Sequence, residues 1–268
     1  MSRVLAGGTD ILVQLRAGLY EVDCLLDVKR VPELNELSYS AAEGLTIGAA
    51  VPNCLIYEDQ DVIRHYPGIV DAAALVGGIA VQGRATIGGN VCNSTPSADT
   101  IPALIVHHTQ CVIQGPGGRR VVPVEEFCTG VRRNVLEPGE LLVAFKIPTP
   151  KPHFGANYLR FIPRNEMDIA VVGVGASVVL DAGGQRIQEA RIALASVAPV
   201  PVFARRAGEA LVGKEANEAS ITEAGEIAKT EASPISDMRG TAEQRTHLIG
   251  VLTRRALRAA VERTREAK

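Results

Sequence analysis

The stretch Val4-Leu5-Ala6-Gly7-Gly8-Thr9-Asp10-Ile11-Leu12 decides how the fold begins. Its apolar first residues predict a strand, its two glycines a tight turn, and its last residues a helix that Thr9 or Asp10 can cap and that Gly18 ends. The apolar run at residues 24–28 predicts a buried parallel strand, and residues 45–47 predict another short strand. The chain is therefore expected to open with a small α/β unit that ends near residue 50.

A second glycine-rich stretch, Ala85-Thr86-Ile87-Gly88-Gly89-Asn90, lies in residues 85–91, which are short and polar enough to be a loop. Glycines permit unusual φ angles and close approach of a ligand to the backbone, where N–H groups can bind an anion. Each stretch taken alone is more simply an ordinary tight turn. Two such loops facing one another can hold a diphosphate, whose two phosphate groups need donors from more than one side.

The rest of the chain divides into two further regions, residues 51–150 and 151–268, joined by a proline-rich linker at residues 148–152. The first is expected to be α+β, with helices at residues 69–76 and 101–107 and strands at residues 111–114, 120–122 and 141–147. In the second, the pattern predicts strands at residues 158–162, 169–180 and 191–197 and helices throughout the Ala- and Glu-rich sequence after Phe203.

Composition excludes several classes of function. The 268 residues are 46% hydrophobic and 22% charged, which is enough for a sizeable core in two or three small domains. A net charge of −2, no tryptophan and 4% aromatic residues argue against a nucleic-acid partner. The longest apolar run, at residues 169–180, is too short to span a bilayer, and no signal-peptide pattern follows Met1. We therefore expect a cytoplasmic protein.

The cysteines and histidines do not suggest a metal site. The five cysteines are scattered without a CxxC pair, so buried, reduced thiols are the simpler interpretation. His107 and His108 are adjacent and point in different directions in regular structure, which makes them a poor ligand pair. No catalytic nucleophile, acid or base is evident, and no catalytic or metal-binding residue is predicted.

A family resemblance joins the two glycine-rich stretches to two further segments. These are Ser94-Thr95-Pro96-Ser97-Ala98-Asp99 and the block that runs from Tyr158-Leu159-Arg160-Phe161 through Arg164 to Asp168-Ile169-Ala170. In this order and over nearly the whole chain, they resemble the FAD-binding medium subunit of molybdenum hydroxylases, the family of xanthine dehydrogenase and aerobic carbon monoxide dehydrogenase. The resemblance implies an α+β, vanillyl-alcohol-oxidase-like (PCMH-type) FAD-binding fold, with two α/β subdomains followed by a C-terminal antiparallel sheet with helices.

The resemblance also implies which residues bind FAD. The diphosphate is expected at the two glycine-rich stretches, on Ala6, Gly7, Gly8, Thr9, Asp10, Ile11, Thr86, Ile87, Gly88, Gly89 and Asn90. Asp99 is expected to bind ribose or ribityl hydroxyls, although it can also simply cap the helix that follows it. Leu142 is expected to touch the cofactor, Arg160 stands where relatives often have Lys near the flavin, and Ile169 is expected beside the isoalloxazine ring.

The implied function is electron transfer within a larger enzyme. A large partner subunit would carry molybdopterin and a small one two [2Fe–2S] clusters, and FAD would pass electrons to NAD, a quinone or oxygen. Two alternatives remain at this point: a scaffold subunit without cofactor, and a stand-alone flavin oxidoreductase. Relatives have a further strand and helix before the first glycine-rich stretch, which implies either a start upstream of Met1 or a shortened N-terminal sheet.

Overall fold

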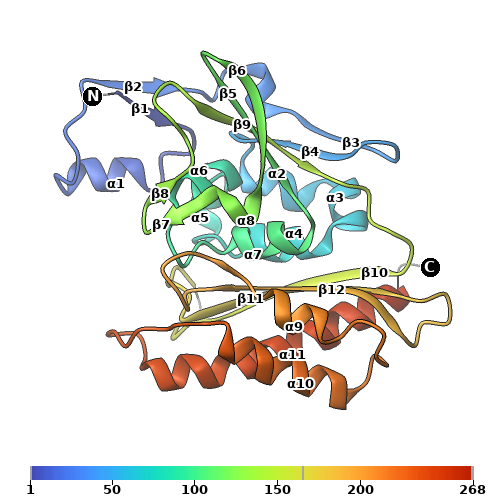
Figure 1. Ribbon diagram of the computed structural model, residues 1–268. Helices are drawn as coiled ribbons and strands as arrows, with labels where there is room; N and C mark the ends of the chain where they lie inside the picture. The colour runs from blue at the N-terminus through green and yellow to red at the C-terminus, as the bar shows by residue number, and fades with distance from the viewer. Residues whose placement is uncertain (1, 165, 267–268) are drawn as a thin grey trace.

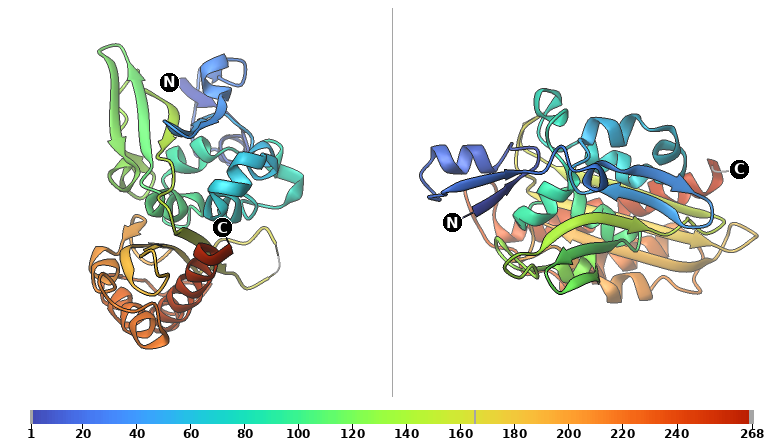
Figure 2. Two further views of the ribbon diagram at one scale, coloured as in Figure 1. Left: turned by 90° about the vertical axis from the view of Figure 1, so that its right-hand side faces the viewer. Right: turned by 90° about the horizontal axis from the view of Figure 1, so that it is seen from above.

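The computed structural model describes residues 2–164 and 166–266 and arranges them in layers (Figures 1 and 2). A five-stranded sheet lies above a layer of short helices, a four-stranded sheet lies beneath those helices, and the last helices cover its far side. A small N-terminal unit sits at one end of the upper layers. This mixture of helices with antiparallel sheets confirms the α+β class. The predicted subdomain boundaries at residues 50 and 150 stay a prediction.

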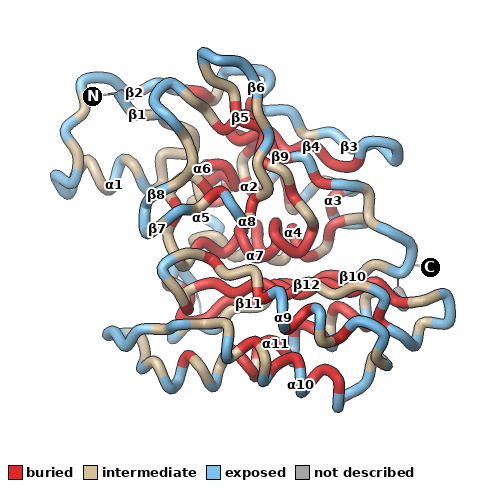
Figure 3. The backbone as a smooth tube through the Cα atoms, in the orientation of Figure 1, coloured by how far each residue is buried: buried red, intermediate tan, exposed pale blue. Residues whose placement is uncertain are grey.

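The N-terminal unit consists of β1 (Ser2–Leu5), α1 (Ile11–Arg16) and β2 (Cys24–Asp27). The parallel strand predicted at residues 24–28 forms as β2, which pairs with β1, and Gly18 adopts φ +68° just after the helix ends. The expected burial of β2 is wrong, because its residues are all exposed or half-buried. A sheet of only two strands buries little surface, because each strand has a neighbour on one side only. The helix of this unit, α1, has no buried residue either (Figure 3).

The five-stranded sheet has the order β3-β4-β9-β5-β6, and every neighbouring pair is antiparallel. Its strands are β3 (Leu37–Ser40), β4 (Gly44–Gly48), β5 (Gln110–Gly115), β6 (Gly118–Pro123) and β9 (Leu141–Ile147), and the 3₁₀ turn η1 (Pro32–Asn35) leads into it. The strand expected at residues 45–47 forms as β4, but it pairs with β9 and not with β1 or β2. Leu45 and Ile47 are buried there against Phe145 and Ile147, so tertiary packing decides the partner.

Short helices and one small hairpin fill the space between the sheets. They are α2 (Asn53–Glu58), α3 (Gln60–His65), α4 (Pro67–Ala73), α5 (Ile79–Gln82), α6 (Ile87–Asn93), α7 (Thr100–Val106), α8 (Val124–Phe127), β7 (Cys128–Gly130) and β8 (Arg133–Asn134). The loop expected at residues 85–91 is wrong, because most of it forms α6. Thr86 caps α6 by accepting the Gly89 N–H at 2.9 Å, and Ile87 and Val91 bury one face of it. The cap and this burial outweigh the low helix propensity of the two glycines.

The C-terminal layer is the antiparallel sheet β10 (Phe154–Phe161), β11 (Val172–Leu180), β12 (Ile187–Ala195) and β13 (Val202–Phe203), covered by α9 (Arg205–Glu209), α10 (Glu218–Thr230) and α11 (Ala242–Glu266). Every residue of β11 is buried, because α7 packs on one face of the sheet and α11 on the other. Helix does not run throughout the residues after Phe203 as expected, since residues 231–241 around Pro234 are irregular.

Glycines allow the helices to approach this sheet closely. A Cβ at Gly155 would lie 2.1 Å from the Ala260 carbonyl oxygen of α11, and one at Gly175 would lie 2.7 Å from the Pro102 carbonyl oxygen of α7. Arg263 of α11 also reaches Asp71 of α4, with Nη2 2.9 Å from Oδ1. The upper layers and the C-terminal layer are therefore in direct backbone and ionic contact. Within the described residues, no helix combines the length and the apolar character needed to cross a membrane.

His107 is buried where these layers meet. Its ring packs between Tyr66 and Phe154, its Nδ1 lies 2.7 Å from the Ala103 carbonyl oxygen, and its Nε2 has no partner among the described residues. Burial lowers the pKa of His107 from 6.5 to about 4, since a charged ring would lose its hydration there. The folded protein therefore keeps His107 neutral at pH values where the unfolded chain protonates it.

We expect this histidine to make the fold less stable in acid. The pKa of His107 is lower in the folded protein than in the unfolded chain. Its contribution to the free energy of unfolding is therefore complete above about pH 6.5, and roughly 3 kcal/mol of it is lost as the pH falls from about 6.5 to about 4. In urea unfolding at a series of pH values, His107→Gln should remove most of that slope. The matched change at exposed His247 should leave the slope in place, and equal slopes for the wild type and His107→Gln would contradict the assignment.

Candidate cofactor-binding site

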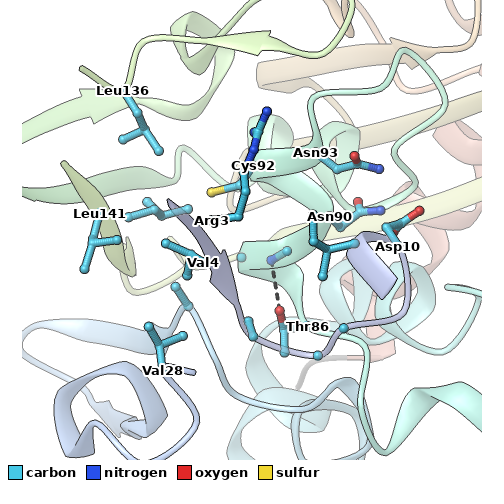
Figure 4. Close-up of a pocket in the computed structure, with 18 of the residues that line it drawn as sticks. Arg3, Val4, Asp10, Val28, Thr86, Asn90, Cys92, Asn93, Leu136 and Leu141 are labelled. Atoms are coloured by element: carbon cyan, nitrogen blue, oxygen red, sulfur yellow. Dashed lines mark hydrogen bonds between the residues drawn. The ribbon is translucent and has the colours of Figure 1, made fainter. Parts of the chain in front are cut away.

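A cavity of about 570 Å³ lies between the N-terminal unit, α6 and the edge of the five-stranded sheet (Figure 4). Its polar side is formed by the two glycine-rich stretches, which include Asn90, and by Asn93. Its apolar side is formed by Val4, Val28, Leu34, Leu136, Leu141 and Leu142. The cavity thus offers backbone donors on one side and an apolar surface for a flat ring on the other.

The two glycine-rich stretches are in direct contact. A Cβ at Gly7 would lie 2.1 Å from the carbonyl oxygen of Arg84, and the Arg84 Nε in turn donates to the Gly7 carbonyl oxygen at 3.4 Å. Gly8 turns the chain with φ +84°, a conformation that favours glycine. The stretches face one another, the arrangement that the family resemblance implies, and this contact requires glycine at position 7.

The second glycine-rich stretch packs against the chain segment that follows β4. A Cβ at Gly88 would lie 2.2 Å from the Ala49 carbonyl oxygen, so α6 packs directly on the backbone after β4. Asn90 is fixed through its Oδ1, which accepts from Thr100 Oγ1 at 2.6 Å and from Thr100 N at 3.3 Å. Backbone and side chain are therefore both immobilised at the position where a ligand would meet them.

The carboxyl end of α6 joins the remaining walls of the cavity. Gln14 Nε2 of α1 donates to Asn93 Oδ1 at 3.3 Å, and Asn134 Nδ2 donates to the Cys92 carbonyl oxygen at 3.0 Å. The turn between β7 and β8 is fixed by the Arg132 N–H, which donates to the Ser94 carbonyl oxygen at 2.9 Å. The β7–β8 hairpin and α1 are thus attached to the same helix.

Most of the predicted FAD-binding residues line this cavity: Ala6, Gly7, Gly8, Thr9, Asp10, Ile11, Thr86, Gly88, Gly89, Asn90 and Leu142. Ile87 does not, because its side chain points into the core of the upper layers. Asp99, Arg160 and Ile169 lie outside the cavity lining, and Ile169 is 49% exposed.

Asp99 and Arg160 form a buried ion pair. The Asp99 carboxylate accepts from Arg160 Nη1 at 2.6 Å and from the Tyr158 hydroxyl at 2.7 Å. The capping role considered for Asp99 is wrong, because its side chain makes no hydrogen bond to the start of α7. Burial raises the pKa of Asp99, while Arg160 and Tyr158 act in the opposite direction. Thr100, which bonds to Asn90, connects this pair to the cavity.

Sequence reasoning missed several other residues that line the cavity. Arg3, Tyr20, Cys92, Arg132, Asn134 and Glu140 all line it. Glu140 is held by Arg120 at 2.7 and 2.6 Å, which lowers the pKa of Glu140 to about 2. The sequence feature that could have pointed to these residues is the polar segment at residues 132–134, which lies between apolar residues. A polar segment does not by itself indicate a ligand.

The close contact at Gly88 leads to a stability prediction. Gly88→Ala should destabilise the protein by about 1–3 kcal/mol, because the new methyl group meets backbone that cannot move aside. Gly83→Ala is the matched control, since a Cβ there has nothing within 4 Å. Urea denaturation of both variants measures the difference. Equal unfolding midpoints would contradict the packing described for α6.

Comparison with known proteins identifies the relatives of this chain. The family described as "FAD binding domain in molybdopterin dehydrogenase" matches residues 1–150, and "CO dehydrogenase flavoprotein C-terminal domain" matches residues 157–260. The xanthine dehydrogenase FAD-binding subunit of Escherichia coli O157:H7 is 32% identical over 261 residues, covering 97% of this chain and 89% of that protein. The carbon monoxide dehydrogenase medium chain of Hydrogenophaga pseudoflava is 30% identical over 259 residues, covering 97% and 89%.

Solved structures show the same fold. Carbon monoxide dehydrogenase from Hydrogenophaga pseudoflava superposes with a TM-score of 0.93 at 30% identity, covering 98% of this chain and 90% of that one. Quinoline 2-oxidoreductase from Pseudomonas putida 86 superposes with a TM-score of 0.89 at 31% identity, with the same coverage. The PCMH-type fold expected from the sequence is confirmed, as are FAD as the cofactor and the oxidoreductase class. This chain belongs to the family of FAD-binding subunits of molybdopterin-dependent dehydrogenases of the xanthine and carbon monoxide dehydrogenase type.

Proposed function

We propose that the chain is the electron-transfer subunit of a cytoplasmic, heteromeric molybdenum hydroxylase. It receives electrons from [2Fe–2S] clusters in a small partner subunit, after substrate oxidation at molybdopterin in a large one. It passes them to an external acceptor such as NAD, a quinone or oxygen. The observation that carries the proposal is the contact between the two glycine-rich stretches at the edge of one cavity.

The residues at the cavity suit the parts of FAD. The backbone N–H groups around Gly7, Gly8, Gly88 and Gly89 would hold the diphosphate, because these four residues line the cavity and backbone N–H groups can bind an anion. The apolar side, including Leu142, would exclude water from a ring system. Bound FAD supplies the redox chemistry, accepting electrons one at a time and delivering two, and the protein positions it and sets its electrostatic surroundings.

Asp99, Arg160 and Ile169 are proposed for the flavin half of the cofactor. Support comes from the hydrogen bonds that run from Asn90, in the cavity wall, to Thr100 beside Asp99. The Arg160 side chain is only 5% exposed, so water screens its positive charge weakly. A weakly screened cation near the flavin favours the reduced, negatively charged form.

The absorption spectrum of the purified protein, with identification of any released cofactor, tests the proposal first. Flavin bands together with released FAD support it, and size-exclusion chromatography of the native protein then shows whether larger and smaller chains accompany it. A colourless protein that does not take up added FAD would favour a scaffold. A yellow protein that elutes alone and turns over a substrate would favour a stand-alone flavin enzyme.

We predict that Arg160→Gln lowers the midpoint potential of the bound flavin, because it removes the positive member of the buried ion pair and leaves the Asp99 carboxylate without its partner. A redox titration of the FAD-loaded protein measures the change. Arg164→Gln serves as the matched control, since the Arg164 side chain is 77% exposed and its charge is screened by water. Equal potentials for the wild type and Arg160→Gln would show that Arg160 does not act on the flavin.

A further inference from the structure

Arg3 places an unpaired positive charge in the cavity. Its side chain extends from β1 into the pocket, where the guanidinium carbon lies 4.3 Å from the centroid of the Tyr20 ring (Figure 4). Its Nε is buried and has no hydrogen-bond partner, and no carboxylate within residues 2–164 and 166–266 forms an ion pair with it. Burying a donor on a cation without a partner is costly, so this arrangement is best explained by an anionic ligand.

Arg132 places a second unpaired positive charge at the cavity, from a different element. It occupies the turn between β7 and β8 in a left-handed conformation, φ +56°, which the hydrogen bond to Ser94 holds in place. Arg132 and Asp10 both line the cavity: burial raises the pKa of Asp10, and the charge of Arg132 acts in the opposite direction. In the described part of the chain, Arg132 has no ion-pair partner within 4.0 Å.

The other charges at the cavity cannot neutralise a diphosphate. They are the carboxylates Asp10, Glu137 and Glu140, and the last is already paired with Arg120. The two helices beside the glycine-rich stretches, α1 and α6, have only six and seven residues, so their dipoles are small. Arg3 and Arg132 are therefore the only positive side chains among the described residues that line the cavity.

We propose that Arg3 and Arg132 bind the diphosphate of FAD, one from each side of the cavity, and that Tyr20 positions Arg3 by stacking on it. The backbone donors of the glycine-rich stretches then shape the diphosphate site, and the two arginines balance its two negative charges. This inference rests on the proposed cofactor role of the cavity and adds the side chains that make it selective for a charged nucleotide.

Binding of FAD, ADP and adenosine to the full chain, purified with any subunits that accompany it and freed of cofactor, tests the inference. The variants are Arg3→Gln and Arg132→Gln, alone and combined. Arg16→Gln and Arg133→Gln are matched controls, since these arginines lie on the same elements or next to them and do not line the cavity. Tyr20→Leu removes the ring that holds Arg3.

Each Gln variant should weaken FAD and ADP binding by about tenfold or more, as expected for a lost charge-assisted hydrogen bond. Adenosine, which has no phosphate, should bind all variants alike. The double variant should lose about the product of the two effects, because the side chains come from separate elements. Tyr20→Leu should show a smaller loss that disappears when Arg3 is already Gln, which a purely structural role of the ring would not produce.

ADP affinities of both single variants within twofold of the wild type would overturn the inference while leaving FAD binding by the wild type untouched. An equal loss of adenosine and ADP affinity would also overturn it, since the arginines would then act on the base or on the fold. A wild type that binds neither FAD nor ADP would remove both this inference and the proposed function.

Discussion

The backbone contact between Gly7 and Arg84 is the constraint on which the site depends. A Cβ at Gly7 would lie 2.1 Å from the Arg84 carbonyl oxygen, so no side chain fits at position 7. The N-terminal unit has few buried residues of its own, and this contact places it against α6, with the Gln14–Asn93 hydrogen bond as a second attachment. The cavity exists because the two glycine-rich stretches are joined in this way.

The C-terminal layer contributes to the site from a distance. Tyr158 and Arg160, both on β10, hold Asp99 at the start of α7, and Asp99 adjoins Thr100, the hydrogen-bond partner of Asn90. Gly173 on β11 makes this possible, since a Cβ there would lie 2.4 Å from the Tyr158 hydroxyl. The antiparallel sheet thus supports the buried ion pair, and through it one wall of the cavity.

The sequence predicted the parts of this structure that depend on neighbouring residues. The strands β1 and β2, the turn at Gly8 and most of the other strands follow from local pattern, and the family resemblance implied that both glycine-rich stretches bind one ligand. The errors have long-range causes. β4 pairs with β9, about a hundred residues later, and α6 forms because Thr86 caps it and the core buries Ile87. Arg3 and Arg132 come together only in the folded chain, so no spacing in the sequence indicates them.

Hydrogen exchange of the backbone amides, with and without FAD, tests most directly whether the cofactor lies across both glycine-rich stretches. The account predicts slower exchange on FAD binding at residues 7–10 and at residues 87–90 together, and little change in α10 and α11, which lie on the far side of the C-terminal sheet. Protection of only one stretch, or protection confined to residues outside the cavity, would contradict it.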